Sequence, residues 1–276
     1  CIVAIDEHDC VHTFDNKQID EGIKFLQQAN KLIGHNIIEF DIPVIKKLKG
    51  IDLYDTNKVV DTLVLSRLFQ PSRDGGHSLE SWGYRLGFHK AKAPEWKDFT
   101  NEMLMYCITD VTLNKKLYHF LQEKASGFSK ESISIEHDVT NILGQQKRNG
   151  FLFDMQEATL LMSKLGRLLQ ETVDEVHKTF NLGSRKQIGE YLQDFGWKPK
   201  QFTPTGQPKV DEGTLKEITH IYEAKLIADF LLYQKRIAQI HSWIEAVGDD
   251  ERVHGAVIST GAITGRMAHR NPNMAQ

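Results

Sequence analysis

Carboxylates and one phenol in the first half of the chain stand where they could hold divalent metal ions. Asp41 lies two residues before Pro43, where the sequence predicts a helix N-cap and where backbone N–H groups would keep a carboxylate ionised. Tyr106 and Asp110 are four residues apart, so they share one face of a predicted helix. Cleavage of a phosphodiester by two metal ions needs converging carboxylates and a group that orients the attacking water. Asp41 and Asp110 are therefore candidate metal ligands, and Tyr106 is the candidate for orienting water.

The same residues also have a purely structural interpretation. Asp41 can be only a helix cap, Asp61 only the end of a strand, and Tyr106 only a half-buried packing residue. Residue types alone leave both interpretations open.

A second group of candidate residues lies at the end of the sequence. Residues 264–266 read Thr-Gly-Arg, and residues 272–276 read Pro-Asn-x-x-Gln. Gly265 would let the backbone approach a ligand closely, and the planar guanidinium of Arg266 suits a phosphate group. A Thr-Gly-Arg sequence alone is as common in turns as in binding sites, but the complete spacing is more specific.

The composition excludes several classes of protein. The chain has 276 residues, of which 40% are hydrophobic and 26% charged, so it is neither disordered nor collagen-like. Its 34 Lys and Arg against 37 Asp and Glu give a net charge of -3, with no whole-chain signal for a polyanion partner. No apolar run approaches the roughly 18 residues of a membrane span, so no membrane partner is predicted. The three cysteines form no CxxC pair, which favours a reducing compartment, and the predicted location is cytoplasmic.

The elements that must position these residues change in character along the chain. The first half alternates strands and helices, with strands predicted at 1–5, 10–14 and 59–62 and helices at 20–33 and 43–48. Such alternation predicts an α/β layer structure. From about residue 127 the strand signals nearly vanish, and apolar residues recur at helical spacing behind capping residues Asp154 and Ser184. We therefore predict a domain boundary at Ser126–Gly127.

Several segments resemble motifs of the proofreading 3′-to-5′ exonucleases of the DEDD superfamily. Residues 35–43, HNIIEFDIP, resemble the second motif of that superfamily, and residues 106–110, YCITD, resemble the third motif, Tyr-x3-Asp. Residues 61–63, 66–68 and 77–87 resemble the intervening segments in order and spacing. The resemblance is closest to bacteriophage DNA polymerases of family A, the polymerase-I type. It implies that residues 1–126 form a ribonuclease-H-like α/β exonuclease domain with a mixed sheet.

The resemblance also implies roles for individual residues. Asp41 and Asp110 would bind Mg²⁺ in a two-metal site, Tyr106 would orient the water, and Asn36 would contact a single-stranded 3′ DNA end. The first motif of the superfamily, Asp-x-Glu, is missing near the start of the sequence. We therefore expect that the first strand of the sheet lies before Cys1 and that the metal site is incomplete.

The second half resembles the polymerase domain of the same family. Residues 146–154 resemble the link from exonuclease to polymerase, residues 233–237 the thumb helix, and residues 258–276 the passage from thumb to palm. The resemblance implies contacts to primer-template DNA by Lys235, Arg236, Thr264, Arg266, Asn273 and Gln276. In the family the palm carboxylates and the fingers helix follow this segment, so we expect the nucleotidyl-transfer site to lie outside this sequence.

We interpret residues 1–276 as a fragment of a family A replicative DNA polymerase, in which residues 127–276 form a mainly α-helical thumb and palm-entry region. A stand-alone DEDD nuclease is one alternative, although it would lack the helical half and residues 264–266. A catalytically inactive DNA-binding module is the other, and the missing Asp-x-Glu is its only support. The sequence identifies no processivity factor.

Overall fold

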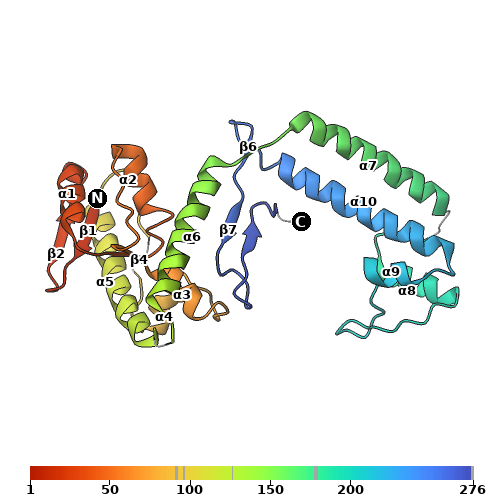
Figure 1. The fold of residues 1–276 in the computed structure, drawn as a ribbon, viewed down its shortest axis with the longest axis horizontal. Coiled ribbons are helices and arrows are strands. Elements are labelled where there is room, and N and C mark those ends of the chain that lie inside the picture. Colours follow the sequence, from red (N-terminus) through yellow and green to blue (C-terminus); the bar gives the residue numbers. More distant parts are fainter. Residues whose placement is uncertain (91–92, 96, 126, 177–179, 275–276) are drawn as a thin grey trace. The chain divides into compact units, whose positions relative to one another are not determined.

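The computed structural model describes residues 1–90, 93–95, 97–125, 127–176 and 180–274, and it divides into two compact units. Unit 1 comprises Cys1–Asn149 and Gly255–Gln276, and unit 2 comprises Gly150–His254. Figure 1 shows the elements of both units, coloured along the sequence. The domain boundary predicted at Ser126–Gly127 stays a prediction, and Ser126 itself lies outside the described residues.

Unit 1 contains short strands and longer helices. Its elements are β1 (Ile2–Ile5), β2 (Val11–Phe14), α1 (Ile19–Gln28), β3 (Leu32–Gly34), α2 (Asp41–Lys49), β4 (Val59–Asp61), α3 (Thr62–Phe69), α4 (Leu79–Arg85), α5 (Asn101–Lys124), α6 (Lys130–Asn149), β7 (Ala256–Ile258) and β8 (Ala268–Arg270). Two apolar clusters hold it together: Ile38 and Ile42 pack with β3 and β4, and Trp82 packs with α3 and α5.

The strands of unit 1 do not form the single mixed sheet that the sequence predicts. Among the described residues, β1 pairs with β2 in an antiparallel register, β3 pairs with β4 in a parallel register, and β7 pairs with β8 in an antiparallel register. Each pair is a separate two-stranded sheet. Strands of three or four residues offer few ladder hydrogen bonds, so the helices packed against them carry most of the burial.

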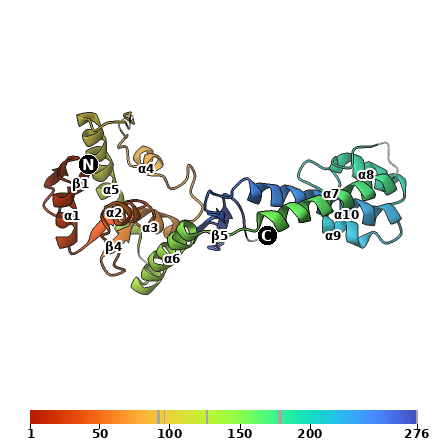
Figure 2. The ribbon, with the colours of Figure 1, turned by 90° about the horizontal axis from the view of Figure 1, so that it is seen from above.

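Unit 2 is built on two long helices. Its elements are β5 (Phe151–Leu152), α7 (Met155–Val176), α8 (Arg185–Asp194), α9 (Glu212–Glu217), α10 (Tyr222–Ile244) and β6 (Arg252–Val253). Helices α7 and α10 lie side by side along their length (Figures 1 and 2). The apolar cluster of the unit contains Ile188, Leu192 and Ile227, all fully buried. Strands β5 and β6 pair antiparallel, so the two ends of the unit meet.

The helix starts of unit 2 follow the predicted capping residues. The Asp154 carboxylate accepts the backbone N–H of Glu157 at 2.9 Å, and the Ser184 hydroxyl accepts that of Gln187 at 3.4 Å. Both predicted caps are therefore confirmed. Among the described residues, no helix combines the length and the apolarity that crossing a bilayer requires.

Candidate functional sites

The sequence predicts Asp41 as the N-cap of this helix, but in the structure Asp41 is the first residue of α2 and follows the N-cap. The N-cap is Phe40, and no side-chain hydrogen bond caps the helix. Although the side chain of Asp41 is exposed at the surface, protein atoms crowd the carboxyl and displace bulk water, which raises its pKa to about 6. The Asp61 carboxylate adds to the increase, and the backbone N–H of Asp41 opposes it. The expected stabilisation of the ionised form by backbone N–H groups is therefore outweighed.

This raised pKa makes the stability of unit 1 depend on pH in a defined direction. The folded chain holds the Asp41 proton more tightly than the unfolded chain, whose pKa is near 3.8. The free energy of unfolding should therefore increase as the pH falls from 7 through 6 towards 4. We expect Asp41→Asn to be more stable than the wild type at pH 7 and to lose this part of the pH dependence. Urea unfolding of both proteins at pH 4.5 and 7 measures the difference, and parallel pH profiles would contradict the prediction.

Asp110 is paired with a lysine that the sequence does not single out. The Lys90 Nζ lies 2.9 Å from Asp110 Oδ2 and 4.8 Å from the centre of the Tyr106 ring. Burial raises the pKa of the Asp110 carboxyl although the Lys90 ammonium lowers it. Burial lowers the pKa of Lys90, but its contacts with Tyr106 and Asp110 together raise this pKa by more. The net pKa of Lys90 is therefore raised, and the ammonium stays charged. The second carboxylate oxygen, Asp110 Oδ1, is buried without a hydrogen-bond partner.

The acidic residues present do not fit a two-metal site. In the described ranges, no three or more His, Cys, Asp or Glu side chains are grouped to hold a metal ion. Asp110 offers one unpartnered oxygen, but Lys90 occupies the other. A two-metal site needs several carboxylates converging within a few ångströms. The roles of Asp41, Tyr106, Asp110 and Mg²⁺ stay predictions, and no reaction step is derived from them.

Asp61 is the centre of a buried hydrogen-bond network. The sequence indicates only that this residue ends a strand. Its Oδ1 accepts the backbone N–H groups of Asn36 at 2.8 Å and Leu63 at 2.9 Å, and its Oδ2 accepts that of Ile38 at 3.2 Å. The backbone N–H of Asp61 donates to His137 Nε2 at 2.8 Å. Asp61 is almost fully buried, which raises its pKa, while the three N–H donors oppose the increase.

This network explains the conformation of Asn36, which the sequence predicts to bind DNA. Asn36 has a φ of 64°, in the left-handed region that asparagine tolerates better than most residues. Its backbone N–H is held by Asp61. The structure therefore gives Asn36 a local structural role, and its contact with DNA stays a prediction.

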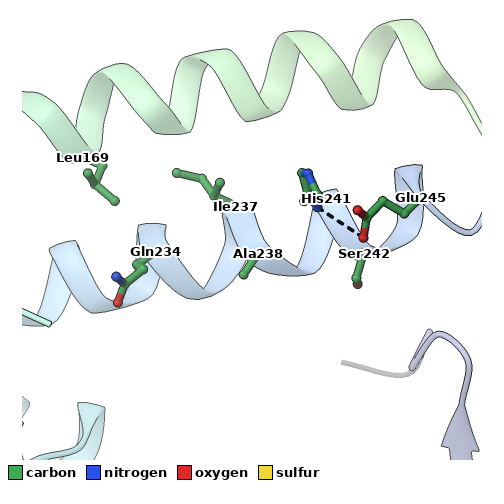
Figure 3. Close-up of a pocket in the computed structure, with 7 residues that line it drawn as sticks. All are labelled: Leu169, Gln234, Ile237, Ala238, His241, Ser242 and Glu245. Carbon is green, nitrogen blue, oxygen red and sulfur yellow. Dashed lines mark ion pairs between the residues drawn. The ribbon is translucent and has the colours of Figure 1, made fainter.

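The predicted cations of the long helix in unit 2 are exposed to solvent. Lys235 and Arg236 lie in α10, and the Arg236 guanidinium donates to Gln239 Oε1 at 2.9 Å. A shallow groove of about 390 Å³ lies beside them (Figure 3). It is lined by Leu169 of α7, by Gln234, Ile237, Ala238, His241 and Ser242 of α10, and by Glu245, which follows the last residue of α10. His241 Nδ1 lies 3.4 Å from Glu245 Oε2 at one end of the groove (Figure 3).

The candidate residues at the end of the sequence lie on and after a hairpin. The loop between β7 and β8 turns where Gly265 N–H donates to Ala262 O and Ala262 N–H donates to Arg266 O. Gly265 has a φ of 73° and open space where a Cβ would stand, so the turn itself explains the glycine. Thr264, Arg266 and Asn273 are exposed, and Gln276 lies outside the described residues.

Comparison with known proteins identifies relatives for the chain. Residues 154–276 match the family model of DNA polymerase family A. The chain is 26% identical to the DNA-directed DNA polymerase of Enterobacteria phage T3, over 91% of this chain and 55% of that protein. It is also 26% identical to the DNA-directed DNA polymerase of Escherichia phage T7, over 89% of this chain and 54% of that protein. The chain therefore spans about half the length of these relatives.

A solved structure corrects the fold predicted for the first half. The chain is similar in structure to the POL domain of Pol1 from M. smegmatis in complex with DNA primer-template and dNTP, with a TM-score of 0.76 and 16% sequence identity. The match covers 98% of this chain and 48% of that chain. A polymerase-domain fold thus covers nearly all of residues 1–126 as well. The prediction of a ribonuclease-H-like exonuclease domain was therefore wrong. The alternative of a stand-alone DEDD nuclease depended on the same fold and loses its structural support.

Proposed function

We propose that this chain, which is related to the family A DNA polymerases, binds primer-template DNA as part of the polymerase domain of a DNA-directed DNA polymerase. The observation that carries the proposal is the family match of residues 154–276, which contain the long helix α10 and the β7–β8 hairpin. The phage relatives support it, because their names state the same activity. The cytoplasmic location expected from the cysteines is part of the proposal.

The chemistry of the proposed DNA contact is attraction between a few cations and phosphate groups. Lys235 and Arg236 are adjacent and exposed in unit 2, and Arg266 is exposed at the hairpin of unit 1. Phosphate contacts hold a protein on the duplex without reading its sequence, and a small number of well-placed cations is sufficient. A net charge of -3 is therefore compatible with DNA binding.

The hydroxyl and amide side chains complete the proposed contact. Thr264 and Asn273 are exposed, and Thr, Asn and Gln side chains donate hydrogen bonds to phosphate oxygens. The acidic residues of unit 1 have no metal-binding role in the proposal, because Lys90 already neutralises Asp110. Mg²⁺ enters it only as the ion that family A polymerases generally use.

The double variant Lys235→Ala, Arg236→Ala tests the contribution of α10. We expect its affinity for a primer-template duplex to fall roughly tenfold, and the slope of log K against log salt to fall by about 2, because two phosphate contacts are lost. Fluorescence anisotropy of a labelled duplex at several salt concentrations measures both quantities.

The double variant Lys164→Ala, Arg167→Ala is the matched control. It removes the same charge from two exposed residues of unit 2, but on α7. We expect its salt slope to stay within experimental error of the wild type. Equal losses in both variants would mean that only the total charge matters, and would refute a specific contact by α10.

A further inference from the structure

Two cysteines from distant parts of unit 1 lie next to each other. Cys1 Sγ is 3.7 Å from Cys107 Sγ, although the two residues are 106 positions apart. Cys1 directly precedes β1, Cys107 lies within α5, and these two elements pack against each other. Both are free thiols. We propose that Cys1 and Cys107 form a reversible disulfide by exchange with a low-molecular-weight disulfide of the oxidised-glutathione class.

The two thiols differ in their exposure to solvent, and this difference determines which of them reacts first. Cys1 is exposed, so a dissolved disulfide can reach its sulfur. Cys107 is half-buried in α5 beside Cys1, so it is placed to react second. This order is the usual course of thiol–disulfide exchange, in which a mixed disulfide forms first.

The chemistry of the proposed reaction balances in two steps. The Cys1 thiolate attacks one sulfur of oxidised glutathione, the glutathione S–S bond breaks, and one glutathione thiolate leaves. The Cys107 thiolate then attacks the Cys1 sulfur of the mixed disulfide, and the second glutathione leaves. Two cysteine thiols are oxidised, one glutathione disulfide is reduced to two thiols, and the protons of the cysteines pass to the leaving groups.

The fold allows the sulfurs to close from 3.7 Å to the roughly 2.05 Å of a disulfide. Cys1 lies outside the β1–β2 ladder, whose register begins with Ile2 opposite Phe14. Rotation of the Cys1 side chain therefore breaks no strand hydrogen bond, and α5 can keep its backbone. The movement needed is confined to the exposed partner.

Cys10 provides a matched control within the same chain. It is also exposed, but its sulfur contacts the His8 carbonyl oxygen at 4.0 Å. Trypsin places Cys1 and Cys10 together on the peptide that ends at Lys17, and Cys107 on residues 98–115. In the variant Cys10→Ser, a cross-link between these two peptides can come only from Cys1 and Cys107.

The experiment equilibrates the Cys10→Ser variant with oxidised glutathione, followed by intact mass, peptide mapping and thiol titration. We expect the mass to fall by two hydrogen atoms, both thiols to disappear, and the tryptic peptides that end at Lys17 and Lys115 to be linked until dithiothreitol is added. Since the link closes a long loop, the Tm should increase by roughly 5 °C or more. Cys1→Ser and Cys107→Ser should show neither the link nor the increase.

Two results would overturn the proposal. One is a stable glutathione adduct on Cys1 with Cys107 still titratable, because the second step would then not occur. The other is a cross-link between two chains, which gel filtration under non-reducing conditions separates from a link within one chain.

Discussion

Replacement of Asp61 by alanine is expected to lower the free energy of unfolding by about 3–5 kcal/mol. The carboxylate is 1% exposed and accepts three backbone N–H groups, from Asn36, Ile38 and Leu63. Alanine leaves these donors without a partner, and each buried unpaired donor costs about 1–3 kcal/mol. Urea unfolding measures the total loss, and hydrogen exchange should show lost protection in unit 1 while unit 2 keeps its own.

Two further variants separate the causes of that loss. Asp61→Asn keeps one acceptor oxygen but turns an NH₂ group towards an N–H donor, so an intermediate loss is expected. Asp52→Ala is the control, because Asp52 is exposed and binds Lys46 and the Tyr54 N–H at the surface. It should cost less than about 1 kcal/mol. A loss for Asp52→Ala equal to that for Asp61→Ala would contradict the role given to burial.

Trp82→Ala is expected to cost about 3–5 kcal/mol, the range for truncation of a buried aromatic residue. Trp82 is 1% exposed, and its Nε1 donates to Ser66 Oγ at 3.0 Å. The guanidinium groups of Arg73 and Arg85 lie 4.4 Å and 5.0 Å from its ring centre, and the Phe120 ring lies 5.4 Å away. Alanine removes these contacts together and leaves a cavity between α3, α4 and α5.

Tyr84 in the same helix is the matched control for Trp82. It is also aromatic but 67% exposed, so Tyr84→Ala should cost less than about 1 kcal/mol. Trp82→Phe keeps the ring volume in part but loses the bond to Ser66, so its cost should lie between the two. Comparable losses for Trp82→Ala and Tyr84→Ala would contradict the role given to the burial of Trp82.

The helices of unit 2 could be predicted because their signals are local. The signals lie within or next to each helix: they are the side-chain caps at Asp154 and Ser184 and the apolar residues at helical spacing. The structure confirms both the caps and the helices. Helix α5 likewise places Tyr106 and Asp110 one turn apart, as expected. Local chemistry was therefore enough to predict these helices and the residues that share a face.

The tertiary partners could not be predicted, because they come from distant positions. Lys90 reaches Asp110 from a segment that shows no helical or strand pattern, and His137 reaches Asp61 from 76 residues away. The prediction of the fold of the first half was wrong for a related reason. The motifs around Asp41 and Asp110 are short, whereas the arrangement of β1 to β4 into separate pairs depends on what the helices cover.

Unit 2 is one continuous stretch of chain, whereas unit 1 combines residues 1–149 with residues 255–276, which follow unit 2 in the sequence. During synthesis at about 5–20 residues per second, residues 150–254 take roughly 5–20 s to appear. Throughout that time α6 has been made, but β7, which packs against it, has not. All residues of unit 2 are therefore synthesised before strands β7 and β8 of unit 1. During this interval the part of α6 that later contacts β7 is not covered by that strand.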